Sequence, residues 1–204
     1  MIDHAYMCAQ VNGWNDSVKA EMEELSKEHG VNSIKVDLTG FTSTEEMMRC
    51  LESCKDLGLA VHATGYNGQA LKLSVERVLA RGTTGPEGHL ISRPEELEFD
   101  AMNRAAVMAR EAGLPVVLSG ISCTASADLV GGPAFGQVGV ASLVASGSNL
   151  FNSCWSHAAG FVCEPPLRDD PEGPSKMVDA AVAKSSGIMV CSHHKVRAIF
   201  EPLL

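Results

Sequence analysis

The sequence lacks the features that mark several large classes of protein. No apolar run approaches the ~18 residues that a membrane-spanning helix needs, and the first residues have neither the positive start nor the apolar core of a secretory leader. Acidic residues outnumber lysine and arginine by 25 to 16, which gives a net charge of -9 without any basic cluster. We therefore expect no membrane and no nucleic acid among the partners, because phosphate binding needs clustered cations.

Several motifs of common sites are also missing. No G-x-G-x-x-G follows the first predicted strand, so the dinucleotide-binding signature is absent, and no serine lies in a G-x-S-x-G elbow. The seven cysteines form no C-x-x-C pair, a pattern typical of free thiols in a reducing compartment. His193 and His194 are adjacent, and adjacent side chains on a strand point to opposite faces, so they do not suggest a metal pair.

What is present is a regular alternation of short apolar segments with helical ones. Strands are predicted over residues 4–12, 31–38, 59–63, 114–119, 137–144 and 188–192, and helices over 16–29, 44–57, 69–79 and from 94 onward. Residues 130–137 and 163–175 are predicted to be irregular. This alternation implies right-handed βαβ units and a parallel sheet. Both an open doubly wound sheet and a (β/α)8 barrel fit, and six strands would leave the barrel open.

The most informative stretch covers residues 82–98, with the sequence GTTGPEGHLISRPEELE. Its first part predicts a turn, in which Gly85 and Gly88 supply free backbone angles and Pro86 fixes one. Pro94 is expected in the first turn of the helix that follows, where the glutamates favour the positive end of the helix dipole. The order of these residues resembles the loop after the fifth barrel strand of dihydropyrimidinases and hydantoinases. The same loop occurs in their non-enzymatic relatives, the collapsin response mediator proteins.

This resemblance implies a fold. Residues 4–11 resemble the third barrel strand of the family, and residues 165–171, PPLRDDP, match its P-P-L-R-x-D-P loop. The connection around 130–137 is shorter than in the family. The resemblance therefore implies a single partial domain over residues 1–204. It would be an incomplete α/β amidohydrolase-type (β/α)8 barrel that consists of about strands 3 to 8 and lacks the N-terminal β-sandwich. We interpret the sequence as a barrel fragment or a short isoform.

The resemblance also identifies the positions where chemistry is expected. Active members hydrolyse cyclic amides with two divalent metals, usually zinc, held by an H-x-H pair, a carboxylated lysine, two further histidines and an aspartate. Lys35 falls on the lysine position and His62 on the third histidine. Gly120 falls where the fourth histidine is expected, Ser192 where the catalytic aspartate is expected, and Gly40 where a tyrosine should follow the lysine. The H-x-H strand lies outside this sequence.

Two remaining ligands do not make a two-metal centre. A catalytic zinc takes three protein ligands and a water, and no general base is in place without the aspartate. We therefore expect no catalytic residue, no cofactor and no metal, with Lys35 and His62 as relict positions and Gly120 and Ser192 as lost ones. Lys35 is then expected to pair with Asp37 or Asp3, and His62 to bond to backbone.

Two functional classes follow from the resemblance. The collapsin response mediator branch implies a cytoplasmic, neuronal scaffold in axon guidance and neurogenesis. It would bind tubulin, organise microtubules and assemble with related chains as homo- or hetero-oligomers. Residues 16–29 and 82–104 are candidate assembly surfaces, and a short chain could also act only by joining longer relatives. The alternative is a divergent zinc-dependent cyclic amidohydrolase, opening dihydropyrimidine or hydantoin rings with ligands recruited from another subunit.

Overall fold

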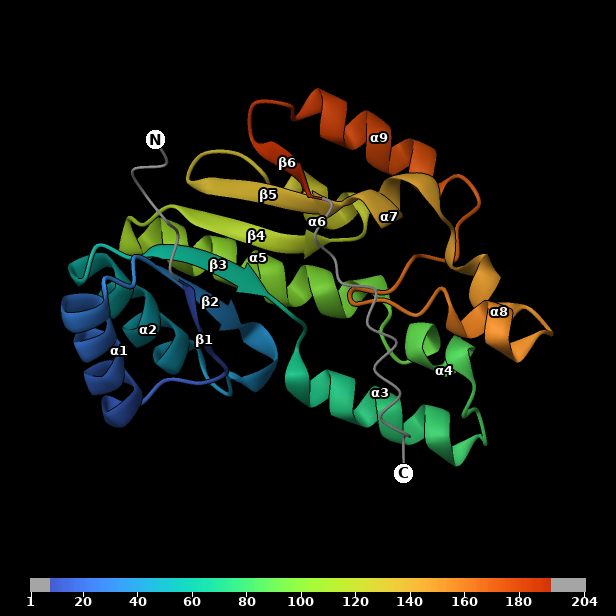
Figure 1. Ribbon diagram of the computed structural model, residues 1–204, viewed down its shortest axis with the longest axis horizontal. Helices are drawn as coiled ribbons and strands as arrows, with labels where there is room; N and C mark the ends of the chain where they lie inside the picture. Colours follow the sequence, from blue (N-terminus) through green and yellow to red (C-terminus); the bar gives the residue numbers. More distant parts are fainter. Residues whose placement is uncertain (1–7, 192–204) are drawn as a thin grey trace.

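A six-stranded parallel sheet forms the centre of the protein (Figure 1). The structure is a computed structural model that describes residues 8–191. The strands are β1 (Cys8–Val11), β2 (Ser33–Asp37), β3 (Ala60–Thr64), β4 (Val116–Ile121), β5 (Ala134–Gly139) and β6 (Ile188–Cys191). Each strand pairs with the next one in the chain, and every pairing is parallel. This order is that of a (β/α)8 barrel, because a doubly wound sheet reverses its order at a switch point. The sheet is a partial barrel, as predicted.

Helices connect the strands. The longer ones are α1 (Asp16–His29), α2 (Thr44–Asp56), α3 (Gly68–Ala80), α5 (Glu95–Ala112) and α9 (Gly173–Ala183). The short ones are η1 (Leu38–Gly40), α4 (Pro86–Ile91), α6 (Thr124–Asp128), α7 (Val140–Val144), η2 (Gly147–Phe151) and α8 (Trp155–Ala159). In Figure 1, α1 and α2 lie beside β1 to β3, and α9 lies beside β5 and β6. Within residues 8–191, no helix combines the length and apolar character needed to cross a bilayer.

The two faces of the sheet differ in character. Alternate residues such as Ile34, Val61 and Leu118 are almost fully buried and pack with Met47 and Met102 of the helices in one core. Burying a side chain of this kind contributes about 1.5–3 kcal/mol. The intervening residues point to the opposite face, as strand geometry requires. That face is polar in its centre and carries the candidate site.

Local signals set the helix boundaries. The Asn15 side chain accepts hydrogen bonds from the backbone of Ser17 and Val18 at 2.9 and 3.0 Å, which starts α1. Gly30 ends the helix in the left-handed region, with φ 68°. The Ser43 hydroxyl accepts a hydrogen bond from Glu46 N–H at 3.1 Å and starts α2 in the same way. The predicted bounds of α1 are therefore confirmed.

Three sequence predictions near the site were wrong in detail. The strand predicted over 137–144 is β5 at Ala134–Gly139, followed by α7, so part of the predicted loop 130–137 is strand. Within β5, Gly136 leaves no room for a side chain, because a Cβ there would lie 2.7 Å from a Val130 methyl group. The predicted turn before α5 contains the short helix α4. Pro94 precedes α5 as its N-cap and does not lie in the first turn.

Candidate functional site

A cavity of about 950 Å³ lies against the polar face of the sheet. Residues of all six strands line it, together with residues of the segments that connect them. The strand residues are Cys8, Ser33, Lys35, Asp37, Ala60, His62, Thr64, Val117, Ser119, Gly120, Gln137 and Met189. Active sites of (β/α)8 barrels are built where the strands end in loops, and Asp37, Thr64 and Gly120 lie at that end. The cavity is therefore the candidate functional site.

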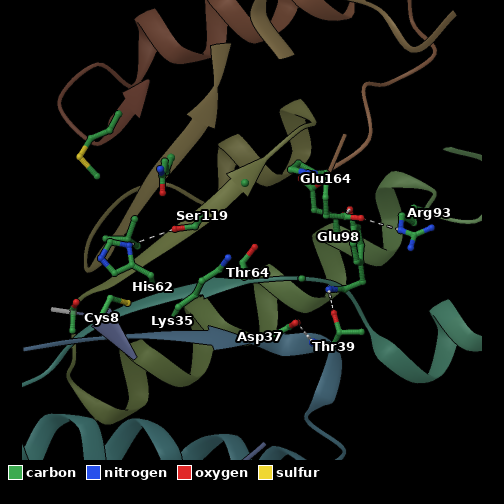
Figure 2. A pocket seen from close by; sticks show the side chains of 18 of the residues that line it. Cys8, Lys35, Asp37, Thr39, His62, Thr64, Arg93, Glu98, Ser119 and Glu164 are labelled. Carbon is green, nitrogen blue, oxygen red and sulfur yellow. Dashed lines mark hydrogen bonds and ion pairs between the residues drawn. The ribbon is translucent and has the colours of Figure 1, made fainter. Parts of the chain in front are cut away.

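Lys35 and His62 are neighbours in this cavity. The two residues are paired in the β2–β3 register and both lie in the partly buried floor of the cavity (Figure 2). Burial lowers the pKa of His62, and the Lys35 ammonium lowers it further. The imidazole Nδ1 lies 3.5 Å from the Ser119 hydroxyl, at the outer limit of a hydrogen bond. His62 therefore contacts a side chain, and the prediction that backbone would satisfy it was wrong.

Lys35 does not pair with Asp37, contrary to the sequence prediction. The Asp37 carboxylate instead accepts the Thr39 backbone N–H at 3.0 Å and caps η1. In the part of the chain that the structure describes, Lys35 makes no ion pair within 4.0 Å and no hydrogen bond. The other predicted partner, Asp3, lies outside the described residues.

Gly120 is a bulge residue at the end of β4. Ser119 pairs with Gln137 and Ile121 pairs with Val138. Between these two pairs β4 has one extra residue, Gly120, that has no partner in β5. Its φ of 81° lies in the region that favours glycine. A Cβ at this position would lie 3.3 Å from Pro165 Cδ and 3.5 Å from Thr64 Oγ1. The backbone and its neighbours are thus adapted to glycine and leave little room for a histidine.

The structure describes one of the other two positions where the resemblance expects a different residue, Gly40, and does not describe Ser192. Gly40 lies at the end of η1, where a Cβ would be only 1.7 Å from the backbone oxygen of Asn12. No tyrosine side chain fits at that position. Ser192, His193 and His194 lie outside the described residues, so the predictions for them stay predictions.

The donor set of the cavity does not fit a two-metal centre. No cluster of three or more His, Cys, Asp or Glu residues suited to a metal ion occurs between residues 8 and 191. Lys35 and His62 are in register, but Gly120 brings no donor to their side. We derive no metal-dependent step from this arrangement.

A buried ion pair forms the far wall of the cavity. The Glu98 carboxylate, whose side chain is 1% exposed, accepts a 2.7 Å bond from Arg168 and a 2.9 Å bond from Ser122 N–H. The Arg168 guanidinium also bonds the Ser122 hydroxyl and the Arg93 backbone oxygen. Burial alone would lower the pKa of Arg168, but the Glu98 carboxylate outweighs it and raises that pKa. Burial and the same carboxylate raise the pKa of the Cys123 thiol to about 12, so this thiol is not activated.

A second cluster continues this wall towards the cavity mouth. The Tyr66 hydroxyl donates to Glu164, and the Arg93 Nε lies 3.3 Å from the same carboxylate. His89 Nε2 lies 2.9 Å from the Cys163 backbone oxygen, and burial followed by the nearby Arg93 lowers the His89 pKa to about 4. This wall was missed as a site in the sequence analysis. Its signal was present, because Glu98 and Arg168 lie in the two stretches that match the family motifs.

The fold and the cavity define a class. A sequential parallel sheet whose polar cavity lies at the loop ends of its strands is the arrangement of (β/α)8 barrels. Over part of their length, this chain is a homologue of the dihydropyrimidinase and hydantoinase family.

Comparisons with known proteins support this statement. No family model matches the chain. The dihydropyrimidinase of Dictyostelium discoideum is 36% identical over 179 residues, which are 83% of this chain and 36% of that protein. Human dihydropyrimidinase-related protein 5 is 31% identical over 193 residues, which are 90% of this chain and 34% of that protein. The solved D-hydantoinase of Bacillus sp. AR9 superimposes with a TM-score of 0.82 at 25% identity, covering 92% of this chain and 43% of that chain.

These figures have two consequences. The chain spans about a third of the length of the curated relatives it matches. Dihydropyrimidinases and a dihydropyrimidinase-related protein match at similar identity, so relatedness alone does not choose between an enzyme and a non-catalytic relative.

Proposed function

We propose that this chain is a non-catalytic scaffold of the kind formed by dihydropyrimidinase-related proteins. The observation that carries the proposal is Gly120. The bulge at this residue has the φ of a glycine, and Pro165 packs against it, at the place where the family resemblance expects a metal-binding histidine. Pro165 lies in the space that a histidine side chain at position 120 would need, and this supports a site without that metal ligand.

The proposed scaffold acts by binding. In this proposal it is cytoplasmic and neuronal, binds tubulin, and assembles with related chains as homo- or hetero-oligomers in the microtubule organisation that accompanies axon guidance. The alignment of 90% of this chain with human dihydropyrimidinase-related protein 5 is compatible with this branch, and the preference over the enzyme rests on Gly120. Exposed apolar side chains on the described surface, among them Val144, Trp155 and Val182, suit a chain that assembles with others.

Microtubule co-sedimentation tests this role. The full chain is spun with taxol-stabilised microtubules, and with a full-length dihydropyrimidinase-related protein in a parallel co-precipitation. We expect saturable pelleting with microtubules, or pelleting that requires the longer relative. Failure to pellet in both experiments, with the protein folded by circular dichroism, would contradict the proposed role.

One observation favours a second candidate, a divergent zinc-dependent cyclic amidohydrolase. Lys35 and His62 keep their register on adjacent strands and both line the cavity. An assembly that supplied the missing donors from another chain could use them. Hydrolysis of dihydrouracil by a co-assembled complex, lost in a Lys35→Met variant, would support this candidate over the scaffold.

A further inference from the structure

The charges that line the cavity are unevenly compensated. Its three carboxylates all receive hydrogen bonds or ion pairs from groups around them. Asp37 accepts from Thr39 N–H, Glu98 from Arg168 and Ser122, and Glu164 from Tyr66 with Arg93 nearby. Each carboxylate therefore has a hydrogen-bond donor or a cation beside it, and of these three only Glu98 and Glu164 have an arginine of the described chain within 4.0 Å.

Lys35 is the exception. Its side chain is partly buried, lies in the cavity floor beside His62, and has neither hydrogen bond nor ion pair within residues 8–191 (Figure 2). His62 does not compensate it, because an imidazole is either neutral or positively charged and never supplies a negative charge. A partly desolvated cation without a counter-charge is unfavourable, and its attraction for an anion is stronger there than in bulk water.

We propose that this cavity binds a small organic carboxylate, and that the carboxylate group of the ligand forms an ion pair with the Lys35 ammonium. The Ser119 hydroxyl and the Gln137 amide lie on the neighbouring strands in register with each other and supply further polar contacts. Val117 and Met189 line the same space and give an apolar surface for the body of the ligand. The inference does not rest on the proposed scaffold role.

The charge of the cavity selects a singly charged ligand. Lys35 is one uncompensated cation, whereas Asp37, Glu98 and Glu164 also line the space and repel further negative charge. A phosphate at neutral pH carries more than one negative charge and is usually held by several donors, such as backbone N–H groups at a helix start. Apolar lining residues favour a ligand with a hydrocarbon part over a small inorganic ion.

Butyrate and butyramide make a matched pair of probes for this proposal. They have nearly the same shape, and only butyrate is charged at neutral pH. The full chain is titrated with each, and with inorganic phosphate, while the amide signals of residues near Lys35 are followed by NMR. We expect saturable shifts with butyrate, and affinity at least roughly tenfold weaker for butyramide and phosphate, because a charge-assisted bond is lost or repulsion is added.

Two variants and one control complete the test. Lys35→Met removes the charge at nearly constant size and is expected to abolish the preference for butyrate, whereas Lys35→Arg is expected to keep it. Lys19→Met, on an exposed position of α1, is expected to behave as the parent chain. Equal affinity for butyrate and butyramide, equal or tighter binding of phosphate, or unchanged butyrate binding in Lys35→Met would each overturn the proposal.

Discussion

The far wall and the floor of the cavity show opposite ways of placing charge in a protein interior. At one wall, Glu98 and Arg168 meet at 2.7 Å, and the remaining atoms of both groups are bonded to Ser122 and to backbone. At the floor, Lys35 and His62 lie side by side without a counter-charge in the described chain. The first arrangement makes the fold depend on both partners, because either charge alone would be buried without compensation, and the second leaves free energy of binding available to a ligand.

The difference also explains which parts of the family pattern persist. The Glu98–Arg168 pair joins the 82–98 stretch to the PPLRDDP loop, so a change at either residue would disturb both. Gly120, where the resemblance expects a histidine, lies in a bulge of β4 with Pro165 beside it. Residues that hold these loops together match the family motifs. Of the positions where the resemblance expects metal ligands, Lys35 and His62 match as well, whereas Gly120 does not.

Arg168→Met should have the largest effect, because it leaves Glu98 buried and charged without its partner. We expect the free energy of unfolding, measured with urea, to fall by about 3–5 kcal/mol. The double variant Glu98→Gln with Arg168→Met removes both charges and should recover part of this loss. A single-variant loss below about 1 kcal/mol would mean that the wall is not held together by this pair.

Acid should destabilise the folded chain through His89. Its pKa is about 4 in the folded protein against 6.5 for an unperturbed histidine, so the unfolded chain binds more protons between these values. Stability is therefore lost as the pH falls from 6.5 towards 4, by at most roughly 3 kcal/mol for this residue. Unfolding measured across this range should be less pH-dependent in His89→Gln. The same substitution at exposed His29 is the control, and an equal change there would contradict the assignment.

Gly120→Ala should cost roughly 1–2 kcal/mol, because a residue other than glycine is strained at φ 81°. Gly58→Ala separates strain from packing, since Gly58 has φ 67° and a Cβ added there would meet no atom within 4 Å. We expect Gly120→His to cost more than either alanine variant, because Pro165 opposes the larger side chain. The melting temperatures of the three variants are compared. An unchanged melting temperature in Gly120→His would show that the bulge accommodates a large side chain.

Lys35→Met should have the smallest effect and the opposite sign. Removing a partly buried cation without a counter-charge is expected to raise the free energy of unfolding by about 0.5–1 kcal/mol. Lys19→Met on the exposed face of α1 should change stability little. If Lys35→Met lowered the stability instead, the ammonium would have a partner, and the contrast between the far wall and the floor would fail.

Much of the fold was predictable from the sequence. The alternation of apolar and helical segments predicted six parallel strands, and the capping residues Asn15 and Gly30 marked the ends of α1. The strand β5 was misplaced because its apolar run continues into the helix α7. The close approach of Gly136 to Val130 is a contact that the sequence does not display. Local periodicity does not report such a contact between distant residues.

The site was predictable in part. The resemblance located Lys35 and His62, and the register placed them together. The expected partner Asp37 does not pair with Lys35 because its carboxylate caps η1, and the other expected partner, Asp3, lies outside the described residues. The Glu98–Arg168 pair joins residues 70 positions apart, and no spacing rule in one sequence connects them.

Zinc content and turnover, measured together, test the central claim most directly. The purified chain is exposed to zinc, dialysed and analysed for metal, and assayed for dihydrouracil hydrolysis, alone and with a full-length relative. The non-catalytic account predicts substoichiometric zinc and no turnover by the chain alone. About two zinc ions per chain, together with hydrolysis that requires Lys35 and His62, would contradict it.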